Sequence, residues 1–131
     1  MHEFSTAQQI LEAALATAKE HNAAKIIRID LEIGSLTFLN PRQLRFSLRV
    51  LSKDTIAEKA AVRIRRTPAT VECWDCGYAG VAKYSGPEQH LNPLLILQCP
   101  RCQSMNTGIL EGRSCNIRTI RIAKQLKSEN N

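Results

Sequence analysis

The fold of this 131-residue chain is decided by Lys25-Ile26-Ile27-Arg28-Ile29-Asp30-Leu31-Glu32-Ile33-Gly34. From Ile27 to Ile33 every second residue is aliphatic, and the residues between them are charged. A period of two residues predicts a β-strand with one buried face. Gly34 followed by a serine ends the strand.

A helix is predicted on each side of this strand. Ser5-Thr6-Ala7-Gln8 has capping-box spacing, and aliphatic residues follow at helical intervals up to His21-Asn22. We therefore expect Met1–Phe4 to lie just outside the first helix. Asn40-Pro41 predicts the start of the second helix, with Asn as its cap and Pro in its first turn. The inner face of that helix is formed by Leu44, Leu48 and Leu51.

Two more strands complete the predicted body. Val62 and Ile64 alternate with arginines until Pro68 stops the strand. After Gly112 the sequence predicts a last strand. Its apolar residues lie at odd positions at first (Cys115, Ile117) and at even positions later (Ile120, Ile122), so a β-bulge is predicted near Arg118-Thr119.

The predicted fold class is α+β, with a small mixed sheet and two helices. We expect this body to comprise residues 1–68 and 113–131. Residues 69–112 consist of short segments punctuated by glycine and proline, and they are expected to form an inserted zinc-ribbon-like module.

Two cysteine pairs lie in the predicted module. Cys73-Trp74-Asp75-Cys76 and Cys99-Pro100-Arg101-Cys102 form the pattern C-x2-C, 22 residues, C-x2-C. Two residues between cysteines let both thiolates of a pair reach one tetrahedral ion, so the pattern predicts one structural Zn(II). The predicted ligands are Cys73, Cys76, Cys99 and Cys102. Four thiolates leave no open position for water or substrate, so the metal would fold the module rather than catalyse a reaction.

An iron–sulfur cluster and a dithiol redox pair are the alternatives for these cysteines. The two symmetric pairs favour zinc over both. The fifth cysteine, Cys115, falls at an apolar strand position and is assigned to packing.

The lack of a membrane-spanning run and of a signal peptide predicts a cytoplasmic protein, and this compartment decides how the cysteines are interpreted. Paired cysteines in a reducing compartment bind metal rather than form disulfides. The longest aliphatic run, Leu94-Leu95-Ile96-Leu97, is far too short to cross a bilayer, and Met1–Phe4 does not begin a signal peptide.

The net charge of +6 is concentrated in one segment. Residues 42–66 hold eight basic and two acidic side chains. Such a segment suits a nucleic acid or an acidic protein partner, and it is equally typical of a solvated helix face and strand edge. A nucleic-acid-binding zinc ribbon is therefore the alternative function. The chain has only six aromatic residues for base stacking, and its basic segment lies outside the ribbon, so this alternative is the weaker one.

The first three residues can chelate a second metal. The amine of Met1, the backbone nitrogen of His2 and its imidazole can bind one ion in adjoining rings, and Glu3 can add a fourth donor through its amide or its carboxylate. An all-nitrogen, roughly planar donor set suits Ni(II) or Cu(II). Taken alone, a histidine at this position is more often a solvated side chain.

The opening Met1-His2-Glu3-Phe4-Ser5 resembles the start of the HypA/HybF family of hydrogenase maturation nickel metallochaperones. The resemblance continues, in order, through nearly the whole chain. It includes Leu31–Leu36, Pro41 with Leu44 and Phe46, Ala60–Ile64, the two cysteine pairs, and Cys115 with Ile117, Ile120 and Ile122.

The resemblance implies that Met1, His2 and Glu3 hold nickel as cargo, while the four cysteines hold structural zinc. It implies that a maturation GTPase is a partner and that the nickel enters the large subunit of a nickel–iron hydrogenase. Some relatives also support urease assembly, which adds a urease accessory protein as a partner. The family is not enzymatic, in agreement with the lack of a nucleophile–base pair or phosphate-binding loop in the sequence. The chain is a monomer or a homodimer on this interpretation.

Several residues depart from the pattern expected of the family. Gln103 stands where the family prefers glycine, Asp54 precedes Thr55 where glycine is expected, and Ser114 replaces an acidic residue. The spacer between the cysteine pairs is also long. It contains His90, which is a weaker candidate for a further nickel ligand.

Overall fold

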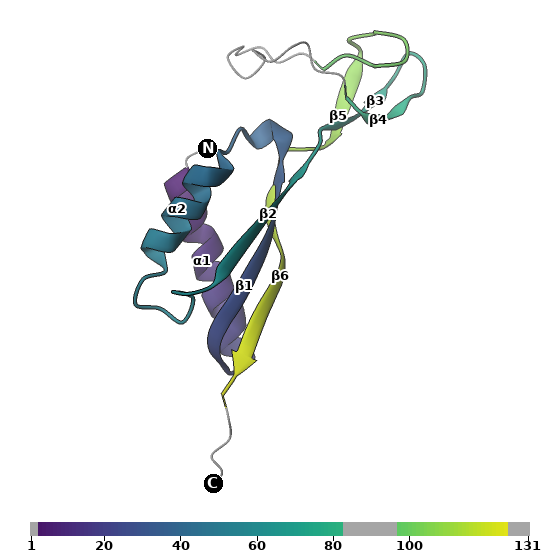
Figure 1. Ribbon diagram of the computed structural model, residues 1–131. Coiled ribbons are helices and arrows are strands. Elements are labelled where there is room, and N and C mark those ends of the chain that lie inside the picture. The colour runs from purple at the N-terminus through teal and green to yellow at the C-terminus, as the bar shows by residue number, and fades with distance from the viewer. Residues whose placement is uncertain (1–2, 83–96, 126–131) are drawn as a thin grey trace. The chain divides into compact units, whose positions relative to one another are not determined.

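Residues 3–82 and 97–125 are described by a computed structural model (Figure 1). The chain divides into two units. The first comprises Met1–Glu32, Leu39–Arg65 and Cys115–Asn131, and the second comprises Ile33–Phe38 and Arg66–Ser114. Among the described residues, no helix is long and apolar enough to cross a membrane.

The first unit is built from two helices and a sheet. Helices α1 (Glu3–Glu20) and α2 (Pro41–Leu51) pack against each other on one face of the sheet (Figure 1). The strands are β1 (Ala23–Gly34), β2 (Ala61–Thr67) and β6 (Cys115–Lys124). Their spatial order is β2-β1-β6, so the strand that dominates the sequence is the central one.

Contacts at the strand ends show that the sheet is mixed. The Thr67 hydroxyl, at the end of β2, donates to the carbonyl of Ile33 near the end of β1. The N–H of Gln125, just past the end of β6, donates to the carbonyl of Asn22, just before β1 (3.1 Å). β2 is therefore parallel to β1 and β6 is antiparallel to it, which confirms the predicted mixed sheet.

The buried face of β1 differs in part from the predicted one. Ile29, Leu31 and Ile33 are buried as predicted. Ile27, however, is 40% exposed, and Ile26 is buried instead at 2%. The N–H of Ile26 donates to the carbonyl of Ile56 in the loop after α2 (2.9 Å). This contact holds the start of the strand, where the buried side chain is that of Ile26, so the predicted inward position of Ile27 is wrong.

Helix α1 begins earlier than its capping signal predicts. Its first residue is Glu3, so Glu3 and Phe4 lie inside the helix and Ser5 lies within its first turn. The Glu3 carboxylate accepts a hydrogen bond from the backbone N–H of Asn40 (2.9 Å). We attribute the earlier start to this tertiary contact, which no local pattern reveals. The helix ends as expected, because Asn22 adopts φ +55° and turns the chain into β1.

The start of α2 agrees with its sequence signal. The side chain of Asn40 accepts hydrogen bonds from the N–H groups of Arg42 (2.9 Å) and Gln43 (3.1 Å). Pro41 occupies the first helical position, where a missing N–H costs nothing. Leu44 and Leu48 are buried against the rest of the unit, as predicted.

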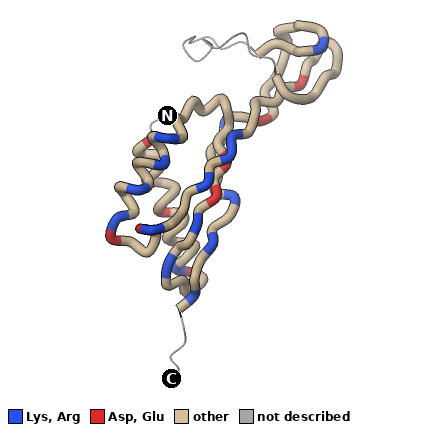
Figure 2. The backbone as a smooth tube through the Cα atoms, in the orientation of Figure 1, with Lys and Arg blue, Asp and Glu red and all other residues tan. Residues whose placement is uncertain are grey.

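The flanking strands keep their predicted faces. Val62 and Ile64 of β2 are half-buried, and they alternate with the exposed residues Ala61, Arg63 and Arg65. In β6, Arg118 and Thr119 are exposed one after the other, which agrees with the predicted switch of parity at this point. Figure 2 shows Lys and Arg recurring along both strands. The core of the first unit comprises Ala7, Ile10, Leu11, Ala14, Ala18, Ile26, Ile29, Leu31, Leu39, Leu44, Leu48 and Ala57.

The second unit is a small antiparallel sheet. Its strands are β3 (Thr70–Cys73), β4 (Ala79–Val81) and β5 (Thr107–Glu111), in the order β4-β3-β5, and a short 3-10 helix, η1 (Ser35–Thr37), also belongs to it. Its core cluster is formed by Ala69, Val71, Ala82 and Leu97, with Leu36 and Tyr78 against them. Within the described part of this unit, the apolar cluster is small, so a bound metal ion would add substantially to its stability.

Two glycines allow a close backbone approach in the second unit. A Cβ on Gly34 would lie 2.2 Å from the carbonyl oxygen of Gly112. Gly112 itself has φ +121° and faces the backbone of Ala69. The N–H of Leu36 donates to the carbonyl of Gly112 (2.8 Å), so glycine at position 34 lets two segments far apart in sequence hydrogen-bond directly.

Candidate metal centre

The first cysteine pair lies where β3 ends. Cys73 is the last residue of β3, and the turn that follows brings Cys76 back beside it. The N–H of Gly77 donates to the carbonyl of Cys73 (3.0 Å) with Gly77 at φ +80°. A glycine adopts this conformation without steric cost, so the local sequence favours the turn.

The second pair repeats this turn with a less suitable residue. The N–H of Gln103 donates to the carbonyl of Cys99 (2.8 Å), which matches the bond of Gly77 in the first pair. Gln103 adopts φ +65°, so a residue with a side chain occupies a position that favours glycine. This is the departure noted in the sequence, and the structure shows that the turn forms despite it.

The two pairs bring four sulfur atoms together. The Sγ atoms of Cys73, Cys76, Cys99 and Cys102 all lie within 4.8 Å of one another. The Sγ atoms of Cys73 and Cys102 are 3.6 Å apart, as are those of Cys76 and Cys99. A tetrahedral zinc with bonds of about 2.3 Å requires sulfur–sulfur separations of about 3.8 Å. The donor type and the spacing therefore both suit Zn(II).

Backbone N–H groups point at the sulfur of Cys99. Those of Arg101 and Cys102 each lie 3.4 Å from it. Burial alone would raise the pKa of Cys99, but these hydrogen bonds outweigh it and lower the pKa to about 6. The pKa of Cys73 is also lowered, mainly by the N–H of Cys76. These two thiols are thus biased toward the thiolate, which is the form that binds metal. At Cys102 the N–H of Ser104 lowers the pKa, but burial and the neighbouring sulfur atoms outweigh it and raise the pKa to about 12.

Side chains next to the ligands tie one cysteine pair to the other. The carboxylate of Asp75, inside the first pair, accepts hydrogen bonds from the hydroxyl of Ser104 and from the amide of Asn106 (3.1 Å). In return, the guanidinium of Arg101, inside the second pair, donates to the carbonyl of Cys76 (3.3 Å). The bond from Ser104, followed by that from Asn106, lowers the pKa of Asp75. These bonds hold the two pairs in register around the cluster.

The arrangement is suited to a structural metal. Cys73 and Cys99 are buried, Cys76 is half-buried, and only Cys102 is exposed. With all four ligands supplied by the protein, no site remains for a substrate at the ion. Cys115 is half-buried on β6 and is not a member of the cluster; its burial raises the pKa of its thiol.

The sequence pattern alone identified the four cysteines but missed the residues that support them. Asp75 and Arg101 occupy the two-residue spacers, and Ser104 and Asn106 follow the second pair. Polar side chains within and just after the pairs were a signal for such support. Which of them pair with each other depends on the three-dimensional arrangement of the two turns.

Of the predicted nickel residues, the structure describes Glu3. Met1, His2 and His90 lie outside the described residues. Glu3 is the first residue of α1, and its Oε2 is hydrogen-bonded to the N–H of Asn40, the cap of α2. The Glu3 side chain is thus anchored to the start of the second helix.

Fold and centre together define the class: a small α+β protein with a cluster of four cysteines that could hold one metal ion. The family model described as "Hydrogenase/urease nickel incorporation, metallochaperone, hypA" matches residues 1–122. The chain therefore belongs to the HypA family. This confirms the family predicted from the sequence, and with it the prediction that the chain is a metallochaperone and not an enzyme.

Related proteins match the sequence of this chain over almost its full length. The hydrogenase maturation factor HypA of Methanothermobacter thermautotrophicus is 37% identical over 125 residues, which cover 95% of this chain and 99% of that one. The factor of the same name from Methanosarcina acetivorans is 34% identical and covers 97% and 99%.

Solved structures of the family share the fold. The solution structure of the Ni metallochaperone HypA from Helicobacter pylori has a TM-score of 0.65 at 19% identity, covering 95% of this chain and all of that one. A second solution structure, of a HypA protein, has a TM-score of 0.66 at 20% identity. At this identity the likeness shows the fold alone, and it confirms the predicted fold class.

Proposed function

We propose that this protein binds one Ni(II) through Met1, His2 and Glu3 and delivers it during maturation of a nickel–iron hydrogenase in the cytoplasm. The four-cysteine cluster holds a structural Zn(II) that folds the second unit. Delivery uses a maturation GTPase as partner and the hydrogenase large subunit as recipient, and urease is a second possible recipient. The observation that carries this proposal is membership of a nickel-incorporation family over residues 1–122, with the chelating sequence at its start.

The anchored side chain of Glu3 supports a particular donor set. Because its Oε2 accepts the N–H of Asn40, the side chain is held toward the second helix, and we assign Glu3 as a donor through its backbone amide, which continues the chelate rings of His2. The amine of Met1, the amide and imidazole of His2 and the amide of Glu3 then give four nitrogen donors. Such a set suits planar Ni(II), whereas the four thiolates suit tetrahedral zinc. The difference in donor type and geometry therefore directs nickel to the N-terminus and zinc to the cysteines.

Nickel titration of the untagged protein tests this assignment. Isothermal calorimetry of the zinc-loaded chain should show one nickel site that His2→Ala removes. His21→Ala is the matched control, because His21 is an exposed histidine of the same unit, beyond the other end of α1, and its loss should leave the affinity unchanged. An extension that blocks the Met1 amine should act like His2→Ala. Equal nickel affinities for the His2 variant and the wild-type chain would refute the assignment.

A further inference from the structure

A pocket opens into the first unit between α2 and the start of β2. It has a volume of about 210 Å³. Four of its lining residues belong to the core and are at most 7% exposed: Leu11, Ile29, Leu48 and Ala57. A cavity of about 150 Å³ is enough to hold benzene. The pocket is therefore large enough for a small molecule with an apolar body the size of one ring.

Small side chains on a well-held loop leave the space for this pocket. Ala60, just before β2, and Ala61, the first residue of β2, line the pocket together with Ala57. The loop that carries Ala57 is fixed by the hydroxyl of Thr55. This hydroxyl donates to the carbonyl of Ser52 (2.6 Å) and accepts a hydrogen bond from the N–H of Ala57 (3.1 Å). Because the pocket is preformed, binding a ligand does not require the loop to become ordered.

Two arginines of α2 line the same pocket. Arg45 and Arg49 lie four residues apart, on one side of the helix. The guanidinium of Arg45 donates to the carbonyl of Val62, another lining residue (3.3 Å). Among the residues that the structure describes, neither arginine is ion-paired. Like charges at this spacing repel each other on a helix, and an anion bound beside them would relieve that repulsion.

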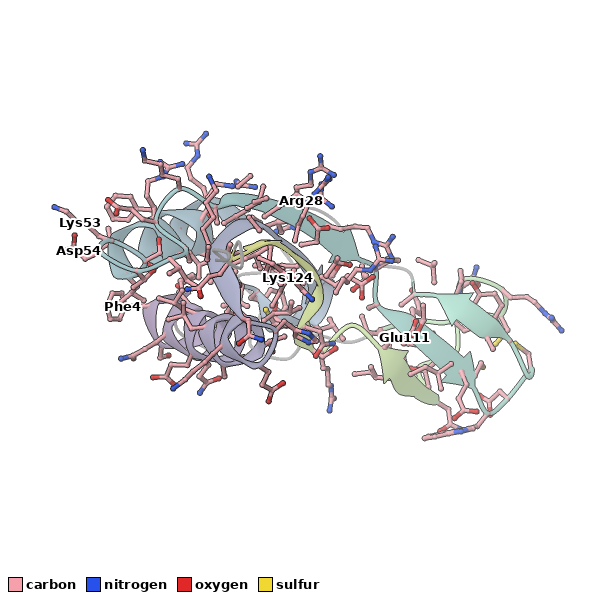
Figure 3. The ribbon with its side chains drawn as sticks, turned by 90° about the horizontal axis from the view of Figure 1, so that it is seen from below. Phe4, Arg28, Lys53, Asp54, Glu111 and Lys124 are labelled. Carbon is pink, nitrogen blue, oxygen red and sulfur yellow. The ribbon has the colours of Figure 1, made fainter. Side chains whose placement is uncertain are left out.

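The charged residues of the neighbouring loop leave this positive charge in excess. Glu58 also lines the pocket, but its carboxylate accepts the N–H of Asp54 in the loop (3.4 Å). Lys53 and Asp54 are exposed and do not line the pocket, and Figure 3 shows them at the outer edge of the first unit. With two arginines against one carboxylate, the pocket combines a net positive charge with an apolar interior.

We propose that this pocket binds a small monocarboxylate with a compact apolar body such as one ring. The apolar body fills the space beside Leu48 and the alanines, and its burial supplies binding energy. The carboxylate lies at the guanidiniums of Arg45 and Arg49, whose planar donor groups match its geometry. The site is distinct from both metal sites, because neither Glu3 nor any of the four clustered cysteines lines the pocket.

A side chain of a partner protein is a poorer occupant of this pocket. The walls come from α1, β1, α2, β2 and the loop between α2 and β2, so the pocket is a hollow in the unit and not a flat face. A partner would have to insert one side chain that has both a carboxylate and a ring-sized apolar body. No side chain of the twenty amino acids has both, so a small molecule suits the pocket better.

Titration with benzoate, followed by the amide chemical shifts of the isotope-labelled, zinc-loaded chain, tests the proposal. The amide signals of Ala57, Ala60 and Ala61 should shift and saturate, with a Kd on the order of 1 mM or below. Benzamide has the ring without the charge, and acetate has the charge without the ring, so each should bind about tenfold more weakly or worse. Shifts that do not saturate with benzoate, or equal binding of benzamide, would overturn the proposal.

Matched variants test the charge and the space separately. Arg49→Gln should weaken benzoate binding by about fivefold or more, whereas Arg42→Gln changes an exposed arginine of α2 outside the pocket and should leave the affinity unchanged. Ala60→Leu fills the space and should abolish binding, whereas Ala16→Leu on the exposed side of α1 should not affect it. Wild-type amide shifts in β3 and β5 and in most of α1 verify that each variant is folded. Equal benzoate affinities of the Arg49→Gln and Arg42→Gln proteins, or an unchanged affinity in folded Ala60→Leu, would contradict the assignment.

Discussion

Gln103 adopts a backbone conformation that its side chain disfavours. Its φ of +65° closes the turn of the second cysteine pair, in the position that Gly77 occupies in the first. The left-handed conformation costs a residue with a Cβ about 1–2 kcal/mol relative to glycine. We expect Gln103→Gly to raise the free energy of unfolding of the zinc-loaded protein by about 1 kcal/mol, measured by urea denaturation. Gln103→Ala, which keeps a Cβ, should give no such gain, and equal stabilities of all three proteins would show that the turn is not strained.

Asp75 acts on the cluster through its hydrogen bonds and not as a ligand. It connects the first cysteine pair to Ser104 and Asn106 after the second pair. Loss of such a supporting residue commonly weakens metal binding by about 10- to 100-fold, and we expect this of Asp75→Ala in competition with a zinc chelator. Glu72→Ala removes the same charge from an exposed site on β3 and should not change zinc affinity. If both variants bound zinc equally well, the two pairs would not need this connection.

At the scale of elements, the start of α2 combines a local signal with a distant contact. The side chain of Asn40 caps α2, while its backbone N–H holds the carboxylate of Glu3. Asn40→Ala removes only the cap and should lower the free energy of unfolding by about 1 kcal/mol. Nickel affinity should stay unchanged, because the bond to Glu3 uses the backbone. Gln9→Ala on the exposed side of α1 is the control for stability. A loss of nickel binding in the Asn40 variant would show that its side chain also serves the nickel site.

Elements defined by neighbouring residues were predictable, and those defined by distant contacts were not. Asn40 and Pro41 specify the start of α2 locally, and the central strand follows from its alternation. The start of α1 was misplaced because the contact that favours an earlier start joins Glu3 to Asn40, 37 residues away. Ile27 was placed inward because alternation alone cannot show that the strand begins beside the distant loop of Ile56, where Ile26 is the buried residue. The four cysteines were found from spacing alone, since two turns of fixed length suffice to gather them.

At the scale of the whole molecule, the two units differ in what stabilises them. Among the described residues, the first has a core that spans both helices and the sheet, whereas the second has a small cluster around Val71 and Leu97. If the proposed zinc supplies much of the folding free energy of the second unit, removing it should unfold that unit selectively. Hydrogen exchange after chelation should show lost protection in β3 and β5 and retained protection in α1 and α2. Protected amides in β3 of the metal-free protein would mean that zinc is not the main stabilising element of that unit.

The central claim is that two metals occupy two different sites and that only one of them is cargo. Metal analysis of the purified, untagged protein before and after nickel loading tests it most directly. We predict one zinc per chain at the outset and one nickel added on loading, with the nickel absent from His2→Ala and the zinc unchanged in it. Nickel that displaces zinc from the cysteine cluster, or that loads equally in His2→Ala, would contradict the account.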